Sequence, residues 1–153
     1  MSEKLKQKSA VVIIATPDAF VLEKRPYLPG KLAYPGKLQL FGGGREYFNG
    51  VPEDGSVAAS RELKEELDLE VSPYELEAYW SGEYEGTGKN GEPVVRDVSV
   101  YRLGITALER SSLHLNVQGE IADIPKTPEA IEAWADDLTP FALDILRKLV
   151  KGE

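Results

Sequence analysis

The chain has 153 residues, 42% of them apolar, and a formal net charge of −8 at pH 7. This length fits one domain with a single hydrophobic core, spanning residues 1–153. The negative charge argues against binding to long nucleic acids, which requires a basic surface. It does not exclude a small phosphate-bearing ligand if a divalent cation screens the acids. The chain has no cysteine, which excludes disulfides and thiolate metal sites.

No apolar stretch approaches the roughly 20 residues that a membrane-spanning helix needs. The apolar run Ser9–Ala15 follows a lysine-rich start but is too short to be the core of a secretory signal. We therefore expect a cytoplasmic protein that has no membrane partner.

The first half of the chain predicts a β-hairpin followed by a loop. The apolar run Ser9–Ala15 and its partner Ala19–Glu23 flank a Thr-Pro-Asp turn. Arg25 follows the second predicted strand. Pro26–Lys37 contains three prolines and two glycines, which predicts a loop. This loop could pack as a lid, but we expect it to cover the core.

A glycine run comes next, after the short predicted strand Leu38–Phe41. Gly42, Gly43 and Gly44 have no side chain, so their backbone can approach a ligand closely and offer a carbonyl to a metal ion. A glycine run alone is more often only a turn, so its significance depends on the helix to which it leads.

The next stretch of the chain predicts a helix. Ser56 can cap its N-terminus. Apolar residues then recur at i, i+4 and i+8, at Ala59, Leu63 and Leu67. This spacing predicts one buried face.

Three acids, Glu62, Glu65 and Glu66, lie at i, i+3 and i+4 on another face of this helix. Like charges at this spacing repel each other by roughly 0.2–0.5 kcal/mol per pair. The helix dipole also disfavours acids in the last turns. The cluster therefore suggests a bound cation. The alternative from the residues alone is a solvated face, on which Arg61 pairs with Glu65.

The stretch Arg61–Leu69 resembles the core of the Nudix box, whose pattern is Arg-Glu-U-x-Glu-Glu-x-Gly-U with U apolar. Glu53 precedes Arg61 by eight positions, as another Glu does in that family. Gly42-Gly43 corresponds to the family's upstream glycine pair, and Glu46 to the acid that usually follows it.

The chain departs from the family pattern at three places. Nine residues separate Gly43 from Glu53, where the family usually has five. Phe41 replaces the proline that precedes the glycine pair. Asp68 stands where the helix-ending glycine is expected, a position that favours left-handed backbone. None of these changes removes a carboxylate.

Beyond the box, alternating residues predict a strand over Tyr74–Tyr84, and Asn90-Gly91 predicts a hairpin turn. We expect the returning strand over Val94–Leu108 and a further short strand over Leu113–Val117. The latter contains the only histidine, His114, to which we assign a structural role.

Two threonine–proline pairs predict helix starts, with the threonine as cap and the proline in the first turn. The first helix runs from Thr127-Pro128 through Trp134, and the second covers Phe141–Val150. Trp80 and Tyr101 could stack on a nucleobase, but we expect them to belong to the core.

The resemblance implies an α+β fold, an α/β/α sandwich with a mixed sheet between helices. It implies a hydrolase that cleaves a diphosphate linkage in a nucleoside diphosphate derivative. The cofactor would be Mg²⁺, with Mn²⁺ as a substitute, and the partner a small nucleotide-like molecule. A homodimer is a possible assembly, although no motif specifies the oligomeric state. The alternatives are a Nudix-fold binding module without catalysis and an acidic interaction domain.

The resemblance also implies roles for single residues. The metal ligands would be the three box acids with the Gly43 backbone, and Glu62 would be a ligand or the general base. Val117–Ile124 looks like the family's loop after the sheet, where some members supply a further metal-binding Glu; Glu120 is the candidate there, with Glu109 and Asp97 as alternatives. The expected catalytic residues are Glu62, Glu65, Glu66 and Arg61, and the expected substrate-binding residues are Arg25, Glu53 and Glu120.

Overall fold

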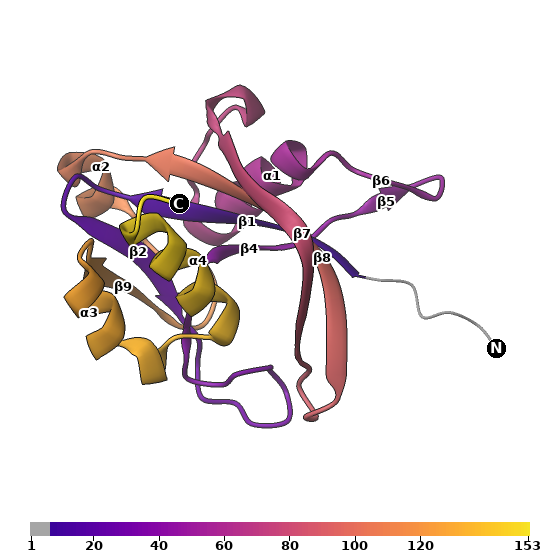
Figure 1. Ribbon diagram of the computed structural model, residues 1–153. Helices are drawn as coiled ribbons and strands as arrows, with labels where there is room; N and C mark the ends of the chain where they lie inside the picture. Colours follow the sequence, from indigo (N-terminus) through magenta and orange to yellow (C-terminus); the bar gives the residue numbers. More distant parts are fainter. Residues whose placement is uncertain (1–6) are drawn as a thin grey trace.

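The protein is described by a computed structural model that covers residues 7–153. A mixed sheet forms the middle layer (Figure 1). Helix α1 (Gly55–Leu67) packs on one face, and α3 (Pro128–Ala133) with α4 (Pro140–Val150) packs on the other. This is the α/β/α sandwich of the α+β class that the resemblance implies.

Five strands form the main path of the sheet, in the order β3-β2-β1-β8-β7. Strand β1 runs parallel to β8, and its other pairings are antiparallel. The strands on this path are β1 (Gln7–Ala15), β2 (Ala19–Lys24), β3 (Leu38–Gln39), β7 (Glu77–Thr87) and β8 (Pro93–Gly104).

Two further strands join the sheet beside this path. Strand β4 (Phe41–Gly44) pairs with the first half of β1, and β2 pairs with its last two residues. Because β8 occupies the other edge of β1, strands β2 and β4 share one edge at opposite ends of it. Strand β9 (Glu120–Pro125) pairs with β2. The sheet is therefore split between β2 and β4.

Alternation along β1 divides the core into two layers. Val12 and Ile14 face α1 and pack with Leu63, while Ile13 faces the opposite layer and packs with Ile145 and its neighbours on α4. Each fully buried aliphatic side chain of this kind contributes roughly 1.5–3 kcal/mol to stability. The two layers fix α1 and α4 on opposite faces of one sheet.

The prediction that Ser56 caps the box helix is wrong. Asp54 occupies the cap position, and its side chain makes no capping hydrogen bond; Ser56 instead donates to the Asp54 carboxylate at 3.1 Å. At the other end, Asp68 adopts the left-handed conformation, with φ 53° and ψ 25°. The expectation of a left-handed helix end is therefore confirmed.

The nine residues between Gly43 and Glu53 contain a small hairpin. Strands β5 (Tyr47–Phe48) and β6 (Val51–Pro52) project from the body of the molecule (Figure 1). At the base of the hairpin, the Glu53 amide donates to the carbonyl of Glu46 at 2.7 Å. The insertion thus loops out, and the chain returns to the helix start.

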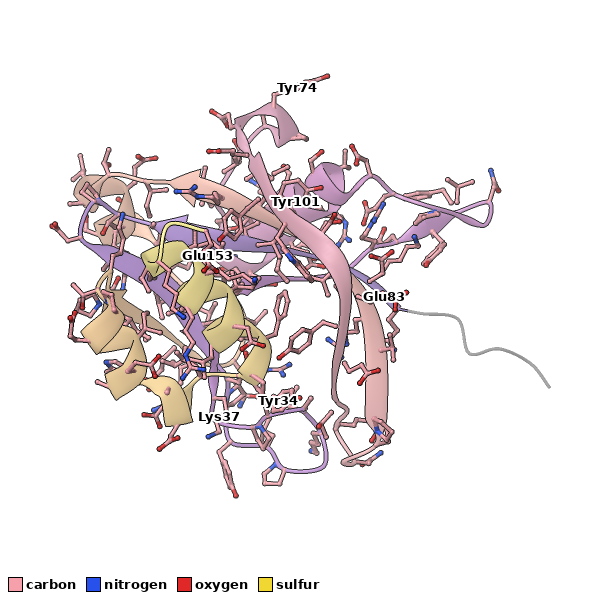
Figure 2. All side chains as sticks on the ribbon, in the orientation of Figure 1. Tyr34, Lys37, Tyr74, Glu83, Tyr101 and Glu153 are labelled. Atoms are coloured by element: carbon pink, nitrogen blue, oxygen red, sulfur yellow. The ribbon has the colours of Figure 1, made fainter. Side chains whose placement is uncertain are left out.

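The strand predicted over Tyr74–Tyr84 begins later, at Glu77. Ser72 caps a 3-10 turn, η1 (Pro73–Glu75), and leaves Tyr74 almost fully exposed (Figure 2). The pairing register also shifts between Ala78 and Trp80. The strict alternation expected for this strand is therefore broken at the shift.

The region after β8 also differs from the prediction. Strand β8 ends at Gly104, because Thr106 and Glu109 form a reciprocal capping box that starts α2 (Ala107–Ser112). Residues 113–117, expected as a strand, form no strand, and Glu120 begins β9 instead of lying in a loop.

The C-terminal predictions are confirmed. Thr127 and Thr139 cap α3 and α4 through their hydroxyls, each followed by a proline in the first turn. A 3-10 turn, η2 (Ala135–Asp137), connects the two helices. Over residues 7–153, no helix is long and apolar enough to span a membrane.

Candidate active site

Gly43 of β4 allows α1 to approach the sheet closely, and Gly42 allows β4 to pair closely with β1. A Cβ atom on Gly43 would lie 2.7 Å from Oε1 of Glu62, so the Glu62 carboxylate rests against the Gly43 backbone. Gly42 has φ 141°, and a Cβ there would lie 2.6 Å from the Cα of Val11. Only glycine combines this positive φ with so close an approach to the β1 backbone, so Gly42 cannot be replaced without strain.

Arg61 connects the acids at the start of the site. Its guanidinium donates to Oε1 of Glu53 at 2.5 Å, to Oε1 of Glu62 at 3.1 Å and to the Gly44 carbonyl at 3.1 Å. It also reaches Glu65 at 3.3 Å. Glu46 lies within ion-pair distance as well, at 3.6 Å. Arg61 thus joins the glycine strand to four carboxylates, and the resemblance implies such an orienting role for the box arginine.

Glu53 is held by this arginine despite the insertion before it. Its side chain is only 6% exposed, and it also accepts a hydrogen bond from the Glu46 amide at 2.8 Å. The hydrogen bond from Arg61 lowers the pKa of Glu53 below its ordinary value, although burial opposes the shift. The contacts of Glu53 therefore lie within the box, and its expected role in substrate binding is untested.

Glu66 lies at the centre of the site in a buried position. The residue is 8% exposed, and its Oε2 atom is buried without a hydrogen-bond partner. Burial raises the pKa of Glu66 to about 9, helped by the nearby charge of Glu23 and by its contact with Glu62, while a backbone hydrogen bond from Gly42 opposes the shift. Glu66 thus has two acidic neighbours, Glu62 on the same helix and Glu23 on β2.

The third box acid lies apart from this crowding. The side chain of Glu65 is 55% exposed and is tied to Arg61. Within residues 7–153, no three acidic or histidine side chains already converge in an arrangement that would hold a metal ion. The structure thus brings together Glu62 and Glu66 and leaves Glu65 at the rim.

A basic cleft adjoins the acids on the other side of the glycine strand. This cavity, of about 390 Å³, is lined by Lys8, Arg25, Arg45 and Arg96, and no acidic side chain lines it. Lys8 is paired with Asp97 at 3.3 Å. In a protein with a net charge of −8, this concentration of cations creates a locally positive potential in the cleft.

A smaller apolar cavity, of about 110 Å³, continues this cleft. Tyr34, Tyr84 and Phe141 line it, and it shares Arg25 and Arg96 with the basic cleft. The Tyr34 hydroxyl accepts a hydrogen bond from the Thr87 amide at 2.7 Å, so the loop between β2 and β3 reaches the β7–β8 hairpin (Figure 2). Burial lowers the pKa of Arg25, and nearby Arg96 lowers it further.

The structure separates the remaining sequence candidates from the acids. Glu120 opposes Lys24 in the β2–β9 register, and strand alternation places it on the face opposite to that of Glu23. Glu109 caps α2, and Asp97 pairs with Lys8. His114 lies in a loop rather than a strand, exposed, 3.1 Å from the Asp68 carboxylate.

The aromatic residues behave as expected for a core. Trp80 packs on Phe141 of α4, with ring centroids 5.9 Å apart, and Tyr101 packs in the layer that α1 covers. The sequence interpretation missed two residues near the cleft, Glu23 and Arg96. The available signal for Glu23 was an acid that continues an apolar strand at a buried position.

No family model matches the chain, and no curated protein matches it in sequence. Solved structures do match it. The MutT protein from Methanosarcina mazei Go1 has a TM-score of 0.72 at 16% identity, over 99% of this chain and 98% of that one. The NUDIX domain of Shewanella oneidensis NrtR, complexed with ADP ribose, has a TM-score of 0.67 at 14% identity, over 98% and 90%.

A larger protein contains a similar domain. The bifunctional NMN adenylyltransferase/ADP ribose pyrophosphatase from Francisella tularensis, complexed with AMP and a Mn ion, has a TM-score of 0.66 at 16% identity. The match covers 99% of this chain but only 43% of that protein. These matches establish the fold: the chain has the fold of the Nudix hydrolases.

Proposed function

We propose that this protein is a Mg²⁺-dependent Nudix hydrolase that cleaves a diphosphate linkage in a nucleoside diphosphate derivative. The observation that carries the proposal is the buried, unpartnered Oε2 of Glu66, crowded by other acids beside a cleft of basic residues. An acid buried without a partner is costly. A metal cation bound by the buried acids and an anionic substrate bound in the basic cleft would each meet residues of opposite charge.

The oxygen donors present suit a divalent cation, but within residues 7–153 three carboxylates do not yet converge on one point, so binding would draw them together. Glu62 and Glu66 would hold it with the Gly43 backbone carbonyl, and Glu65 would join from the rim. These are the oxygen donors that Mg²⁺ prefers, and Mn²⁺ accepts the same set. When bound, the cation supplies charge neutralisation at phosphorus and lowers the pKa of water.

The chain's own residues would do the remaining work. Arg25 and Arg96 would bind the phosphate oxygens, and Arg61 would keep the carboxylates oriented. Water attacks phosphorus, the bond to the bridging oxygen breaks, and the leaving phosphate takes the electron pair. A box carboxylate accepts the proton of the water. The apolar cavity under Tyr34 would receive the non-phosphate part of the substrate.

The ligands of the similar structures guide the choice of substrates. AMP and ADP ribose, in the Francisella and Shewanella complexes, are both adenine nucleotides. We therefore place nucleoside diphosphate derivatives first among the compounds to test. We assign this activity to a single domain that spans residues 1–153.

Phosphate or nucleotide release across a panel of nucleoside diphosphate derivatives tests this proposal. We expect release with Mg²⁺ and none with a chelator. Glu62→Gln should lower turnover by roughly 10²-fold or more, the range for loss of a ligand or proton acceptor. Glu85→Gln, which removes an exposed acid from β7, is the control and should leave turnover unchanged.

Turnover that persists in chelator, or equal turnover in Glu62→Gln and wild type, would contradict the proposal. Nucleotide binding without any release would contradict the enzyme and favour the binding module. Neither binding nor release, with no effect of Mg²⁺, would favour the acidic interaction domain.

A further inference from the structure

Glu23 is a buried acid that lies outside the Nudix box. It is 7% exposed and belongs to β2, whose other buried residues are apolar. Along this strand, Val21 packs in the layer under α1, whereas Leu22 packs in the layer under α4. Glu23 is two residues beyond Val21, so its side chain enters the α1 layer. Ile121, its partner on β9, packs on the same side.

This placement brings Glu23 to the buried acid of the box. Glu66 lies on the buried side of α1, and the charges of the two carboxylates interact. Glu62 is the third acid here, and the Arg25 guanidinium is the cation whose charge reaches both Glu23 and Glu66. Arg25 is directed elsewhere, because its guanidinium donates to the Ala33 carbonyl at 2.5 Å.

Glu23 has little local compensation for its charge. Its Oε1 accepts a hydrogen bond from Nε2 of Gln39 at 2.6 Å, and among the described residues it forms no ion pair within 4.0 Å. A buried carboxylate with one neutral partner is expensive. The neighbouring Glu66 Oε2 has no partner at all. A cation between the two acids would remove both deficits.

We propose that Glu23 contributes a third carboxylate to the divalent-cation site, so that the site is built from β2 as well as from the box helix. This inference rests on the proposed function. It assigns a metal role to a residue that no part of the box motif contains. With Glu62 and Glu66, the site would offer three negative charges, and the number of ligand charges is a main determinant of affinity for hard cations.

The consecutive residues Glu23, Lys24 and Arg25 would then have three different environments. Alternation directs Glu23 toward the acids and Lys24 to the exposed opposite face. Arg25, at the end of the strand, lines the basic cleft. Gln39, paired with Glu23 in the β2–β3 register, fixes the Glu23 carboxylate and also lines that cleft. Strand β2 and the residue that follows it thus supply an acidic side chain, Glu23, for the metal ion and a basic side chain, Arg25, for the phosphate groups of the substrate.

Titration calorimetry with Mn²⁺ alone, without any substrate, tests this inference on the full chain. Glu23→Gln keeps the shape of the side chain and an acceptor for Gln39, and removes only the charge. We expect it to weaken Mn²⁺ binding about tenfold or more, as the loss of a supporting ligand does. Glu85→Gln makes the same change on an exposed strand position and should bind Mn²⁺ as wild type does.

Two further measurements separate charge from packing. Without metal, Glu23→Gln should unfold at the wild-type temperature or above it, because it no longer buries a carboxylate that has only one neutral partner. Glu23→Asp, which keeps the charge, should bind Mn²⁺ more tightly than Glu23→Gln. A lower unfolding temperature for Glu23→Gln, or equally weak binding by both variants, would overturn the inference in favour of a packing role.

The two failures are distinguishable. If wild type binds Mn²⁺, Glu66→Gln loses binding and Glu23→Gln keeps it, the role of Glu23 is overturned and the proposed function stands. If wild type does not bind Mn²⁺, the metal-dependent function fails, and the role of Glu23 fails with it.

Discussion

At the residue scale, the site depends on how one arginine distributes its hydrogen bonds. Arg61 contacts Glu53, Glu62, Glu65 and the Gly44 carbonyl. A planar guanidinium can bind several acceptors in fixed directions, whereas a lysine ammonium cannot. Its partners raise the pKa of Arg61 further, so it is charged at every working pH. Arg61 therefore sets the position of carboxylates that would otherwise repel each other.

The Arg61–Glu53 pair makes stability sensitive to acid. The pKa of Glu53 is lowered in the folded protein, so the pair stabilises the fold above the ordinary Glu pKa of about 4.3. This stability is lost as pH falls through the lower, folded pKa. Glu53→Gln should therefore be less stable at pH 7 and should show a shallower decline in acid.

Thermal unfolding of both proteins between pH 7 and pH 3 checks this expectation. Glu85→Gln is the matched control, and its profile should run parallel to that of wild type. A parallel profile for Glu53→Gln would show that Arg61 does not stabilise Glu53 by charge.

Gly42 and Gly43 are expected to differ in their response to the same substitution. In Gly42→Ala the added Cβ meets the backbone of Ala10 and Val11, at a φ that alanine rarely adopts, so the fold should be strongly destabilised. In Gly43→Ala the Cβ meets only the end of the Glu62 side chain, which can move. Gly43→Ala should fold but bind Mn²⁺ more weakly.

Thermal unfolding and Mn²⁺ titration of the two variants decide this point. Wild-type Mn²⁺ affinity in Gly43→Ala would mean that the contact between Gly43 and Glu62 has no role in the metal site.

At the scale of elements, the end of α1 is a place where this chain differs from the Nudix box pattern, with Asp68 instead of glycine, and the difference costs stability. Asp68 has left-handed backbone, which costs most non-glycine residues roughly 1–2 kcal/mol and Asp somewhat less. Its contact with the His114 side chain, at 3.1 Å, is exposed and contributes little. Asp68→Gly should therefore raise the free energy of unfolding by up to about 1 kcal/mol.

Asp68→Ala is the control for this prediction, since it loses the same contact without gaining the freedom of glycine. It should lower the free energy of unfolding, as measured by urea denaturation. Equal stability of the two variants would show that the backbone conformation at Asp68 carries no strain.

The loop between β2 and β3 is fastened over the apolar cavity at two points near the site. The Thr87 amide donates to Tyr34, and Arg25 donates to Ala33. Tyr34→Phe removes the first contact, and a hydrogen bond of this kind contributes about 1 kcal/mol. Amide hydrogen exchange at Thr87 should become faster by about tenfold or less, while exchange at Val12 in the central strand stays unchanged. Unchanged exchange at Thr87 would mean that Tyr34 does not fasten the loop.

Several elements could be predicted from the sequence because their signals are local. The box helix, the Thr-Pro starts of α3 and α4, and the Asn90-Gly91 turn each depend on neighbours within a few residues. The returning strand predicted over Val94–Leu108 ends early because the Thr106–Glu109 capping box starts a helix there. A capping box is also local, and it could have been recognised from Thr106 and Glu109.

The sequence could not predict which residues join the site from a distance. Glu23 comes near Glu66 only because β2 pairs with the end of β1, the strand that α1 covers. Arg96 reaches the cleft through the parallel pairing of β1 and β8, which no short motif encodes. Glu120 was placed by analogy with a loop, and its strand register directs it away from the acids.

At the scale of the whole molecule, charge is distributed unevenly around the split between β2 and β4. The protein carries a net charge of −8, yet the cleft beside the glycine strand is lined by four basic residues. The buried acids lie on the α1 side, and the basic residues lie on the side that faces the cleft. A cation and a phosphate chain placed across this split would each meet opposite charge, which is the physical basis of the proposed function.

The most direct test of the metal site is thermal unfolding of wild type and Glu66→Gln with and without Mg²⁺. At a Mg²⁺ concentration of 100 Kd, a site present only in the folded state adds about 2.7 kcal/mol of stability. Wild type should therefore gain several degrees in Tm. Glu66→Gln should unfold at a higher temperature than wild type without metal at neutral pH, because the raised pKa of Glu66 means that wild type must take up a proton there to fold, and the variant should gain nothing from Mg²⁺. An equal gain in both proteins, or none in wild type, would contradict the metal site.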